Sequence, residues 1–316
     1  MAEYTQTQSL RISEEFSNLI LHYGSFHRAI LQYIMSIKTV PEAELLQYMQ
    51  RCLLSTILDS YNDTQDVNMG QFVQDTEVAL QEFSEQAYGE LLDKWELEDP
   101  LVNADDVHRI IRQINEKLNN LDFQVVRCAD QEEADKSVYI FVNKASTASI
   151  KLSTSYTEKQ IEVINKLIEH MFVDPFDKST GELTYSISKN AARNIGRDLN
   201  MSVYDAEQLL NDLQAKDWFQ TYQNSKIMLS TRGLMELKPY LANLFEIRSA
   251  ETPQGAVSVC DGCKEILNRG VACPDADCHV RFHPGCYDLV KSATTNDHTC
   301  SNKECSQVIE DFVVFN

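Results

Sequence analysis

The sequence has 316 residues, a formal net charge of −20 and 43% hydrophobic residues. This length allows two or three domains, and the acidic balance disfavours uniform binding to phosphate backbones. No run of about eighteen apolar residues occurs, so we expect no membrane-spanning helix and no membrane partner. The start of the sequence lacks a charged stretch followed by an apolar one, so we expect an intracellular protein with reduced thiols.

The first part of the chain is predicted to be helical after a polar N-terminal segment, residues 1–24. A second helix is expected to open at Pro41, because proline is favoured at the first helical position. In the helix before it, apolar residues recur at helical spacing on one face: Phe26, Ile30, Ile34 and Ile37.

Residues 59–100 differ from their surroundings in charge. They contain twelve acidic residues and one basic residue, Lys94, yet apolar residues still recur among them. We interpret the segment as an acidic, partly helical insertion. Its charge is consistent with a solvated face or with a docking surface for a basic partner.

A strongly amphipathic helix follows Pro100, and two strands follow the helix. Three helices and then a β-hairpin is the order of a winged helix, which we assign to residues 25–143, insertion included. Residues 144–156 are rich in small polar side chains and are expected to be a connector. The apolar stripe of the amphipathic helix consists of Val107, Ile110, Ile111, Ile114, Leu118 and Leu121.

The same order of elements returns in residues 157–250, which predicts a second winged helix. Thr157 and Gln160 have the spacing of a capping box, and Ser202 is suited to cap the third helix. In DNA-binding winged helices the third helix enters the major groove. Here that helix is acidic, and its counterpart in the first domain is only mildly basic, so we expect both domains to bind protein rather than duplex DNA. The residues concerned are Asp205, Glu207, Asp212 and Lys216, and in the first domain Asp106, Arg109, Arg112, Glu116 and Lys117.

The last part of the chain, residues 256–316, is called here the cysteine-rich module. Its cysteines and one histidine fall in four close pairs, the spacing at which turns supply the four ligands of a tetrahedral zinc ion. Four pairs make two sites, so zinc is the predicted cofactor, as two structural ions. A disulfide scaffold is disfavoured by the histidine and by the odd cysteine count. The predicted ligands are Cys260, Cys263, Cys273, Cys278, His283, Cys286, Cys300 and Cys305.

In a cross-braced module the first and third pairs share one ion, and the second and fourth pairs share the other. This groups Cys260 and Cys263 with His283 and Cys286, and leaves Cys273, Cys278, Cys300 and Cys305 for the second ion. His279 and His298 are alternative ligands, but His283 is favoured because His-x-x-Cys is a common ligand pair. The module has a small apolar core, consisting mainly of Ile266, Leu267, Val271, Val280, Phe282, Leu289 and Val290.

The ligand order Cys-Cys-Cys-Cys-His-Cys-Cys-Cys is shared by RING variants and PHD fingers. Together with the stretches at residues 139–147 and 151–162, it resembles one family. This is the family of non-structural maintenance of chromosomes element 1, the RING-bearing subunit of the SMC five–six complex. The expected fold is mostly α with small β-hairpins, in which tandem winged-helix domains precede a two-zinc cross-braced variant RING.

The resemblance implies a nuclear subunit that acts in DNA repair and chromosome maintenance. It implies binding to a MAGE-type subunit and to a kleisin subunit, and a role as, or within, a RING-type ubiquitin ligase. Two alternatives remain. One is an architectural, protein-binding subunit whose module has no intrinsic ligase activity. The other is a PHD-like chromatin reader, which is disfavoured because the tryptophans, Trp95 and Trp218, lie outside the module.

The sequence departs from ordinary RING ligases at three positions. Gly262 stands where an aliphatic residue is usual before the second ligand, Ser301 where proline often follows the seventh, and Ser306 where a basic residue often follows the eighth. These departures predict weak ubiquitin transfer by the chain alone and stronger transfer with its MAGE-type partner. No catalytic residue is expected, and the conjugating enzyme is predicted to dock on Gly262, Ile266, Tyr287 and Leu289.

Overall fold

The structure is a computed structural model. It describes residues 14–61, 67–82, 85–95, 97, 102–131, 133, 136–144, 155–173, 183–223, 225–252, 255–275, 277–293 and 299–315. The chain divides into two compact units, Met1–Val125 and Val126–Asn316. None of the helices in the described stretches has both the length and the apolar character that crossing a membrane requires. The expected fold class, mostly helical with small sheets, is confirmed.

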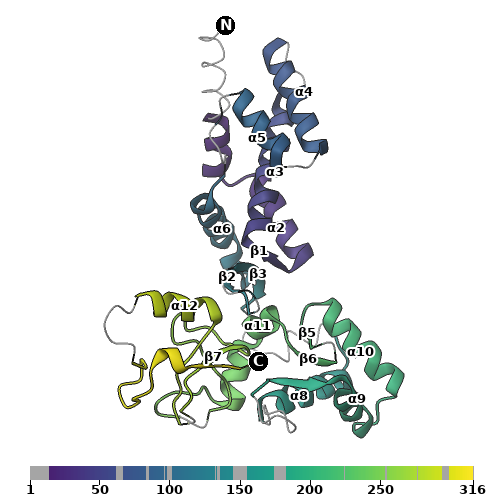
Figure 1. Cartoon of the computed structure of the whole chain (residues 1–316). Helices are drawn as coiled ribbons and strands as arrows, with labels where there is room; N and C mark the ends of the chain where they lie inside the picture. Colours follow the sequence, from purple (N-terminus) through teal and green to yellow (C-terminus); the bar gives the residue numbers. More distant parts are fainter. Residues whose placement is uncertain are drawn as a thin grey trace. The chain divides into compact units, whose positions relative to one another are not determined.

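The first unit is built from helices (Figure 1). The described elements are a helix at 14–21, α2 (Ser25–Ile37), β1 (Thr39–Pro41), α3 (Glu42–Tyr61), α4 (Val67–Glu82), α5 (Glu85–Lys94), α6 (Ala104–Leu118) and η1 (Asn119–Leu121). Helix α3 begins one residue after Pro41, which ends β1. Asn103 caps α6 by accepting hydrogen bonds from the backbone of Asp105 and Asp106, at 2.9 and 3.1 Å.

The predicted apolar faces of α2 and α6 are confirmed except at their ends. Along α2, Phe26, Ile30 and Ile34 are buried, whereas Ile37 is 47% exposed. Ile37 is the last helical residue, and the chain turns away at Lys38 with φ of 76°. Leu121 is likewise exposed, because it lies in η1, past the end of α6. Helical spacing alone does not show where a helix stops.

The described part of the acidic segment is helical, in agreement with the predicted partly helical insertion. Phe72 of α4 packs edge-on against Trp95, which follows α5, with ring centroids 5.2 Å apart. Asp75 accepts a hydrogen bond from Trp95 Nε1 at 3.0 Å and pairs with Lys94 Nζ at 2.7 Å. Lys94, the one basic residue of the segment, therefore pairs with an acidic residue of the same segment.

The second unit begins within β2 (Phe123–Ala129). Strand β3 (Ser137–Asn143) packs against α11 (Thr231–Phe245), where Val138, Ile140 and Val142 lie near Met235. The remaining winged-helix elements are α8 (Glu158–Val173), β4 (Ser186–Ser188), α9 (Lys189–Asp198), α10 (Val203–Ala215), β5 (Phe219–Tyr222) and β6 (Lys226–Leu229). The sheet order is β4-β6-β5, with antiparallel pairs such as Ile187 opposite Ile227 and Thr221 opposite Ile227.

Side-chain caps fix the ends of these helices where the sequence predicts them. The capping box of α8 is present: Thr157 N donates to Gln160 Oε1 at 2.9 Å, and Gln160 N donates to Thr157 Oγ1 at 3.3 Å. Ser202 Oγ accepts from Asp205 N at 3.0 Å and so caps α10. Helix α11 continues through Pro239. The predicted order of the second winged helix is thus confirmed element by element.

The cysteine-rich module follows α11. Its elements are β7 (Gly270–Ala272), β8 (Arg281–Phe282), α12 (Pro284–Ala293), η2 (Ile309–Asp311) and β9 (Val313–Phe315). The strands form a sheet in the order β8-β7-β9, with Val271 opposite both Phe282 and Val314. This small sheet holds the loops that carry the cysteines.

A single apolar core runs from the second winged helix into the module. It joins residues of α8, α10 and α11, such as Leu167, Leu213 and Leu237, to Val257 and Ile266 of the module. Polar contacts cross the same boundary: Asn268 Nδ2 donates to Leu229 O at 2.8 Å, and Lys238 Nζ pairs with Glu265 at 2.6 Å. The winged helix and the module therefore pack as one body, although the sequence predicts them as separate domains.

A buried arginine reinforces this junction. Arg281 Nη1 donates to Tyr185 Oη at 3.2 Å and to Ser258 Oγ, and the guanidinium lies 5.3 Å from the ring centroid of Phe315. Tyr185 precedes β4 of the winged helix, and its hydroxyl also lies 2.6 Å from Ser258 Oγ. Buried polar groups are tolerated when they are hydrogen-bonded, so this network fixes how the module meets the winged helix.

Candidate metal centres

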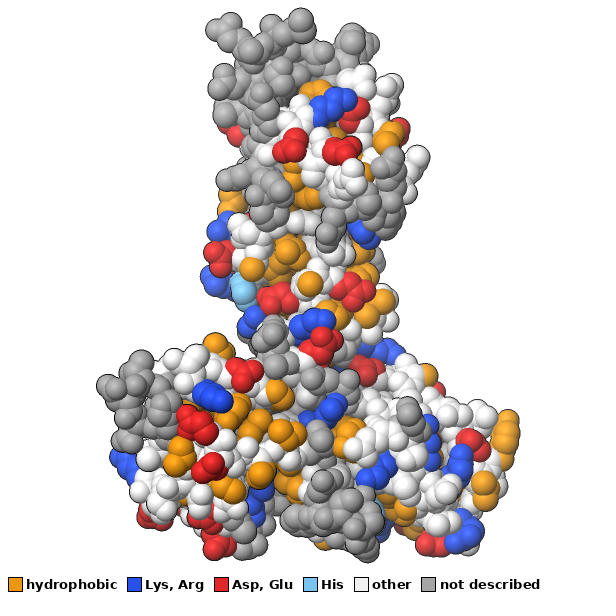
Figure 2. Space-filling view, viewed as in Figure 1, with side chains coloured by type: hydrophobic (Ala, Val, Ile, Leu, Met, Phe, Trp, Pro, Cys, Tyr) orange, Lys and Arg blue, Asp and Glu red, His pale blue; other side chains and the backbone are white. Residues whose placement is uncertain are grey.

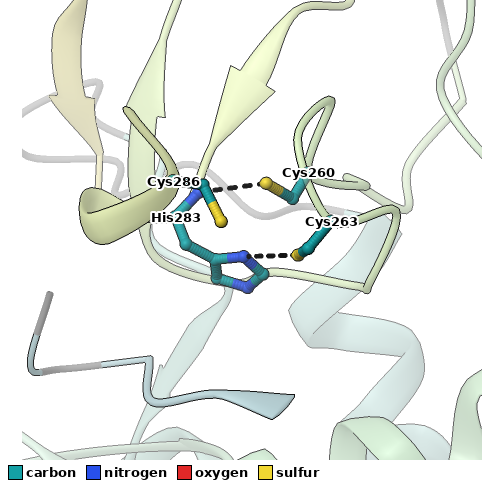
Figure 3. A group of neighbouring side chains, drawn as sticks. All are labelled: Cys260, Cys263, His283 and Cys286. Atoms are coloured by element: carbon teal, nitrogen blue, oxygen red, sulfur yellow. Dashed lines mark hydrogen bonds between the residues drawn. The ribbon is translucent and has the colours of Figure 1, made fainter. Parts of the chain in front are cut away.

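The module's elements bring the first predicted ligand set together, which we call site 1. Cys260 and Cys263 flank a turn closed by a hydrogen bond from Lys264 N to Cys260 O, 2.9 Å long. His283 follows β8 directly, and Cys286 lies in the first turn of α12, which opens at Pro284. The four ligand atoms lie within 4.8 Å of one another (Figure 3).

Within site 1 the histidine ring presents one nitrogen to the sulfur atoms. His283 Nδ1 lies 3.3 Å from Cys263 Sγ, and the His283 backbone N–H donates to Cys260 Sγ at 3.4 Å (Figure 3). Cys260 and His283 are buried, Cys286 is half-buried and Cys263 is exposed. Site 1 therefore has one ligand that solvent reaches directly.

The second predicted set also comes together, as site 2. Cys273 follows β7, and its backbone N–H donates to Val280 O at 3.1 Å across the loop. Cys278 and Cys305 each close a turn, with hydrogen bonds of 3.0 Å to Asp275 O and Asn302 O. All four cysteines of site 2, including Cys300, are buried. The cross-braced grouping predicted from the order of the pairs is thus the grouping that the fold produces.

The sulfur separations fit a metal better than disulfides. In site 2, Cys273 Sγ lies 3.6 Å from Cys305 Sγ, and Cys278 Sγ lies 3.7 Å from Cys300 Sγ. A disulfide requires about 2.05 Å between sulfurs. A tetrahedral ion with Zn–S bonds of about 2.3 Å holds neighbouring sulfurs about 3.8 Å apart. All nine cysteines of the chain are free thiols, so the residues present fit a closed four-ligand metal site.

The electrostatics of the clusters favour a cation. Burial raises the pKa of the Cys300 thiol to about 12. Burial lowers the pKa of His283, but the thiols of Cys260 and Cys263 outweigh this effect and raise it to about 9. Groups packed this closely need either protons or a metal ion between them, and metal binding displaces the protons.

Three contacts connect the metal centres to their surroundings. Ser301 Oγ donates to Asp261 Oδ2 at 2.5 Å, which joins the loop after Cys300 to the turn between Cys260 and Cys263. From its position in the sequence, Ser301 is recognisable only as a departure from ordinary RING domains. Asn302 Nδ2 lies 3.7 Å from Cys278 Sγ. A third contact, from Gln131 to His283, comes from outside the module, and no sequence pattern points to it.

The alternative histidines take no part in the described clusters. His279 belongs to neither group of metal-ligating side chains that the described residues form. His298 lies outside the described residues. His283 is therefore the histidine that the fold places among the cysteines, as the sequence predicts.

The predicted docking residues do not all share one surface. Leu289 is 71% exposed on α12, Gly262 is exposed, and Tyr287 is half-buried with its hydroxyl donating to Ile309 O at 2.9 Å. Ile266 is fully buried, because it packs into the core shared with the winged helix. The structure therefore removes Ile266 from the predicted docking surface, while Figure 2 shows exposed apolar side chains over the module.

Gly262 has a packing reason to lack a side chain. A Cβ at this position would lie 3.2 Å from Cys286 Cβ and 3.7 Å from the sulfurs of Cys260 and Cys286. A larger aliphatic group, usual in RING ligases, would press on the ligands of site 1. The position lies beside Cys286, and Leu289 follows Cys286 by one helical turn. Gly262 and Leu289 therefore border the same surface.

Comparison with known proteins agrees with the fold and the site. A family model described as "Nse1 non-SMC component of SMC5-6 complex" matches residues 27–237, and a RING-like domain model matches residues 260–305. The chain belongs to the Nse1 family. Its C-terminal module is a RING-like domain.

Individual relatives show the same similarity over part of their length. The chain is 23% identical over 192 residues to the human non-structural maintenance of chromosomes element 1 homolog, covering 61% of this chain and 66% of the relative. It is 29% identical over 182 residues to the Schizosaccharomyces pombe protein, covering 57% and 70%. The alignment thus spans slightly less than two thirds of the human relative.

A solved structure shares the fold over nearly the whole chain. A chain of an "Nse1-Nse3-Nse4 complex" matches with a TM-score of 0.57 and 17% identity, covering 90% of this chain and 97% of that chain. At this level of identity the likeness concerns the fold.

Proposed function

We propose that the chain is the zinc-binding, RING-bearing subunit of an SMC five–six complex in the nucleus, acting in DNA repair and chromosome maintenance. In this role it binds a MAGE-type and a kleisin subunit and supports ubiquitin transfer. The observation that carries the proposal is the cross-braced pair of four-ligand clusters, joined through one core to a region of the Nse1 family.

Two zinc ions would be held by the ligands of site 1 and site 2. All eight positions are protein groups, so the ions supply cross-links between loops rather than a site for water or substrate. The chain itself positions the loops through the β8-β7-β9 sheet, the turn hydrogen bonds and the bond between Ser301 and Asp261.

Ubiquitin transfer by such a module requires positioning only. A RING holds a charged conjugating enzyme in a reactive geometry and contributes no covalent step. The docking surface consists of Gly262, Tyr287 and Leu289, without Ile266. The surface lacks an aliphatic side chain at Gly262 and the side chain of Ile266. Both absences support weak transfer by the chain alone and stronger transfer with the MAGE-type partner.

The winged helices are proposed to bind protein. On α10, Glu207 pairs with Arg193 at 2.9 Å, and Asp212 pairs with Lys216 at 2.8 Å, so its basic neighbours are used within the fold. We expect the full chain to bind duplex DNA more weakly than about 1 μM at physiological salt, as non-specific binders do. Sub-micromolar binding in a titration would contradict this expectation.

The experiment that tests the ligase function is a discharge assay. Ubiquitin release from a panel of charged conjugating enzymes is measured with the chain alone and with the MAGE-type partner. We expect faster discharge with the partner, and a loss for Leu289→Ala. Val314→Ala is the matched control, because Val314 is 72% exposed on β9, as Leu289 is 71% exposed on α12.

The alternative is an architectural subunit without ligase activity. The burial of Ile266 and the missing side chain at Gly262 favour it. Absence of discharge under every condition, from protein that contains both zinc ions, would replace the ligase proposal with this one.

A further inference from the structure

Gln131 is a buried amide that contacts site 1 from outside the cysteine-rich module. It follows β2 and is only 2% exposed. Its amide nitrogen lies 2.8 Å from His283 Nε2, although the two residues are 152 positions apart in sequence. The amide also reaches Ile266 O and Asn268 N, each at 3.4 Å. The contact to the histidine ring is therefore its shortest.

The two nitrogens of His283 face different partners. Nδ1 lies on the side of the sulfurs, 3.3 Å from Cys263 Sγ, and Nε2 faces Gln131. A metal ion held among the four ligands therefore bonds to Nδ1. The ring proton then resides on Nε2, where it needs an acceptor because His283 is buried.

We propose that Gln131 is the positioning residue of His283. It accepts the Nε2 proton through its amide oxygen when Nδ1 binds zinc, which fixes the tautomer and the orientation of the ring. The inference rests on zinc ligation by site 1, as proposed above. It extends the metal centre beyond the RING-like module to the loop that joins β2 to β3.

The glutamine side chain suits this role. In the structure the amide nitrogen faces Nε2 and donates to Ile266 O, while the amide oxygen accepts from Asn268 N. A half-turn of the terminal amide turns its oxygen toward Nε2, and it exchanges these two contacts of 3.4 Å for a hydrogen bond over the shorter distance of 2.8 Å to the ring. The amide is neutral, so it adds no charge beside three cysteine ligands. Metal-bound histidines commonly donate their other N–H to such a partner, and removing the partner costs about 10–100-fold in metal affinity or activity.

The test compares near-isosteric variants of the full chain loaded with zinc. Gln131→Met keeps about the same volume but offers only a weak sulfur acceptor to the Nε2–H group, whereas Gln131→Glu keeps an oxygen acceptor. Glu133→Gln is the matched control, because Glu133 lies in the same loop, is exposed and pairs with Lys136 at 2.5 Å. The rate of zinc loss to a chelator is measured for each ion.

We expect Gln131→Met to lose one ion about 10–100-fold faster and the other at the wild-type rate. Glu133→Gln is expected to retain both ions within about threefold of the wild type, a small part of that range. Gln131→Glu is expected to lose the ion more slowly than Gln131→Met, because it keeps an oxygen acceptor although it adds a charge. Cobalt substitution identifies the affected ion, because a ligand set that includes a histidine and one made only of cysteines give different visible spectra. The perturbed spectrum should be that of the site with the histidine.

A second measurement reports on the proton itself. In histidine-labelled protein, nitrogen–proton NMR should show a protected Nε2 proton on His283 in the wild type and in Gln131→Glu, and its loss of protection in Gln131→Met. An unprotected Nε2 proton in the wild type overturns the proposal. So does Gln131→Met if it keeps both ions or loses both together, or Gln131→Glu if it loses the ion as Gln131→Met does.

The proposed zinc sites and the proposed role of Gln131 can be contradicted independently of each other. A wild-type chain that binds no zinc would contradict the proposed metal sites and, with them, the role of Gln131. A wild type with two ions and an unaffected Gln131→Met would contradict only the role of Gln131.

Discussion

Site 1 and site 2 lie in one small module but differ in what surrounds them. The four cysteines of site 2 are all buried, and Asn302 and Asp275, which contact their sulfurs, belong to the module's own turns. Site 1 includes an exposed cysteine and a histidine that contacts Gln131, a residue outside the module. We infer that site 2 holds the module together, and that site 1 joins it to the rest of the chain.

The largest expected effect is on stability, to which we expect the two sites to contribute unequally. Cys273→Ser should remove the ion of site 2 and destabilise the second unit by about 4–5 kcal/mol, as loss of a metal does. Cys263→Ser should also remove one ion but cost less, because Cys263 is exposed and not part of the apolar core. Elemental analysis and denaturant unfolding measure both quantities. Equal losses of stability in the two variants would contradict the different roles that we infer for site 1 and site 2.

The two ions are expected to leave the protein in a fixed order. We expect a chelator to remove zinc in two phases and to take the ion of site 1 first, because solvent reaches Cys263 directly. The rates should differ at least about tenfold, the lower end of the effect of outer contacts on metal retention. Stopped-flow absorbance with a zinc indicator gives the rates, and cobalt spectra assign the phases. Release of the ion from the all-cysteine site 2 first would reverse the assignment.

A smaller effect on stability is expected from the hydrogen bond between Ser301 and Asp261, which connects the loops of the two sites. Ser301→Ala removes the hydrogen bond to Asp261 and should cost about 0.5–1.5 kcal/mol, the net value of one hydrogen bond. The reported quantity is the midpoint of thermal or denaturant unfolding. Ser306→Ala, at another exposed serine of the module, is the control. If both substitutions shift the midpoint equally, the bond between the loops is unimportant.

The smallest effect on stability is expected at Leu289, on the proposed docking surface. Leu289→Ala should change stability by less than about 0.5 kcal/mol, because the side chain is exposed. The same substitution should slow ubiquitin discharge, as described above. A large loss of stability would show that α12 packs more tightly than its exposed face indicates, and would make Leu289 unsuitable for the discharge assay.

The metal centres were predictable because their signal is local. Each pair, such as Cys260 with Cys263, is read from adjacent positions, and few ways of combining four pairs exist. The helix faces were predictable for the same reason, since α2 and α6 repeat their apolar residues at helical spacing. The errors at Ile37 and Leu121 occur where the helix ends, which spacing does not indicate.

The contacts between distant segments were not predictable. Ile266 follows the second ligand of site 1 and has the position of a surface residue in a RING, yet a neighbouring domain covers it. Gln131 lies in a polar turn whose composition suggests only exposure to solvent. Both cases depend on which distant segments pack against the module, and one sequence alone does not contain that information.

The core shared by the second winged helix and the cysteine-rich module limits how this chain can be altered. Apolar residues such as Ile227, Leu237 and Ile266 belong to one continuous cluster. A RING grafted from another protein would have to match that cluster side chain by side chain, or leave it open to water. The module is therefore not an interchangeable cassette. A cell short of zinc would be expected to lose the second winged helix together with the RING-like module.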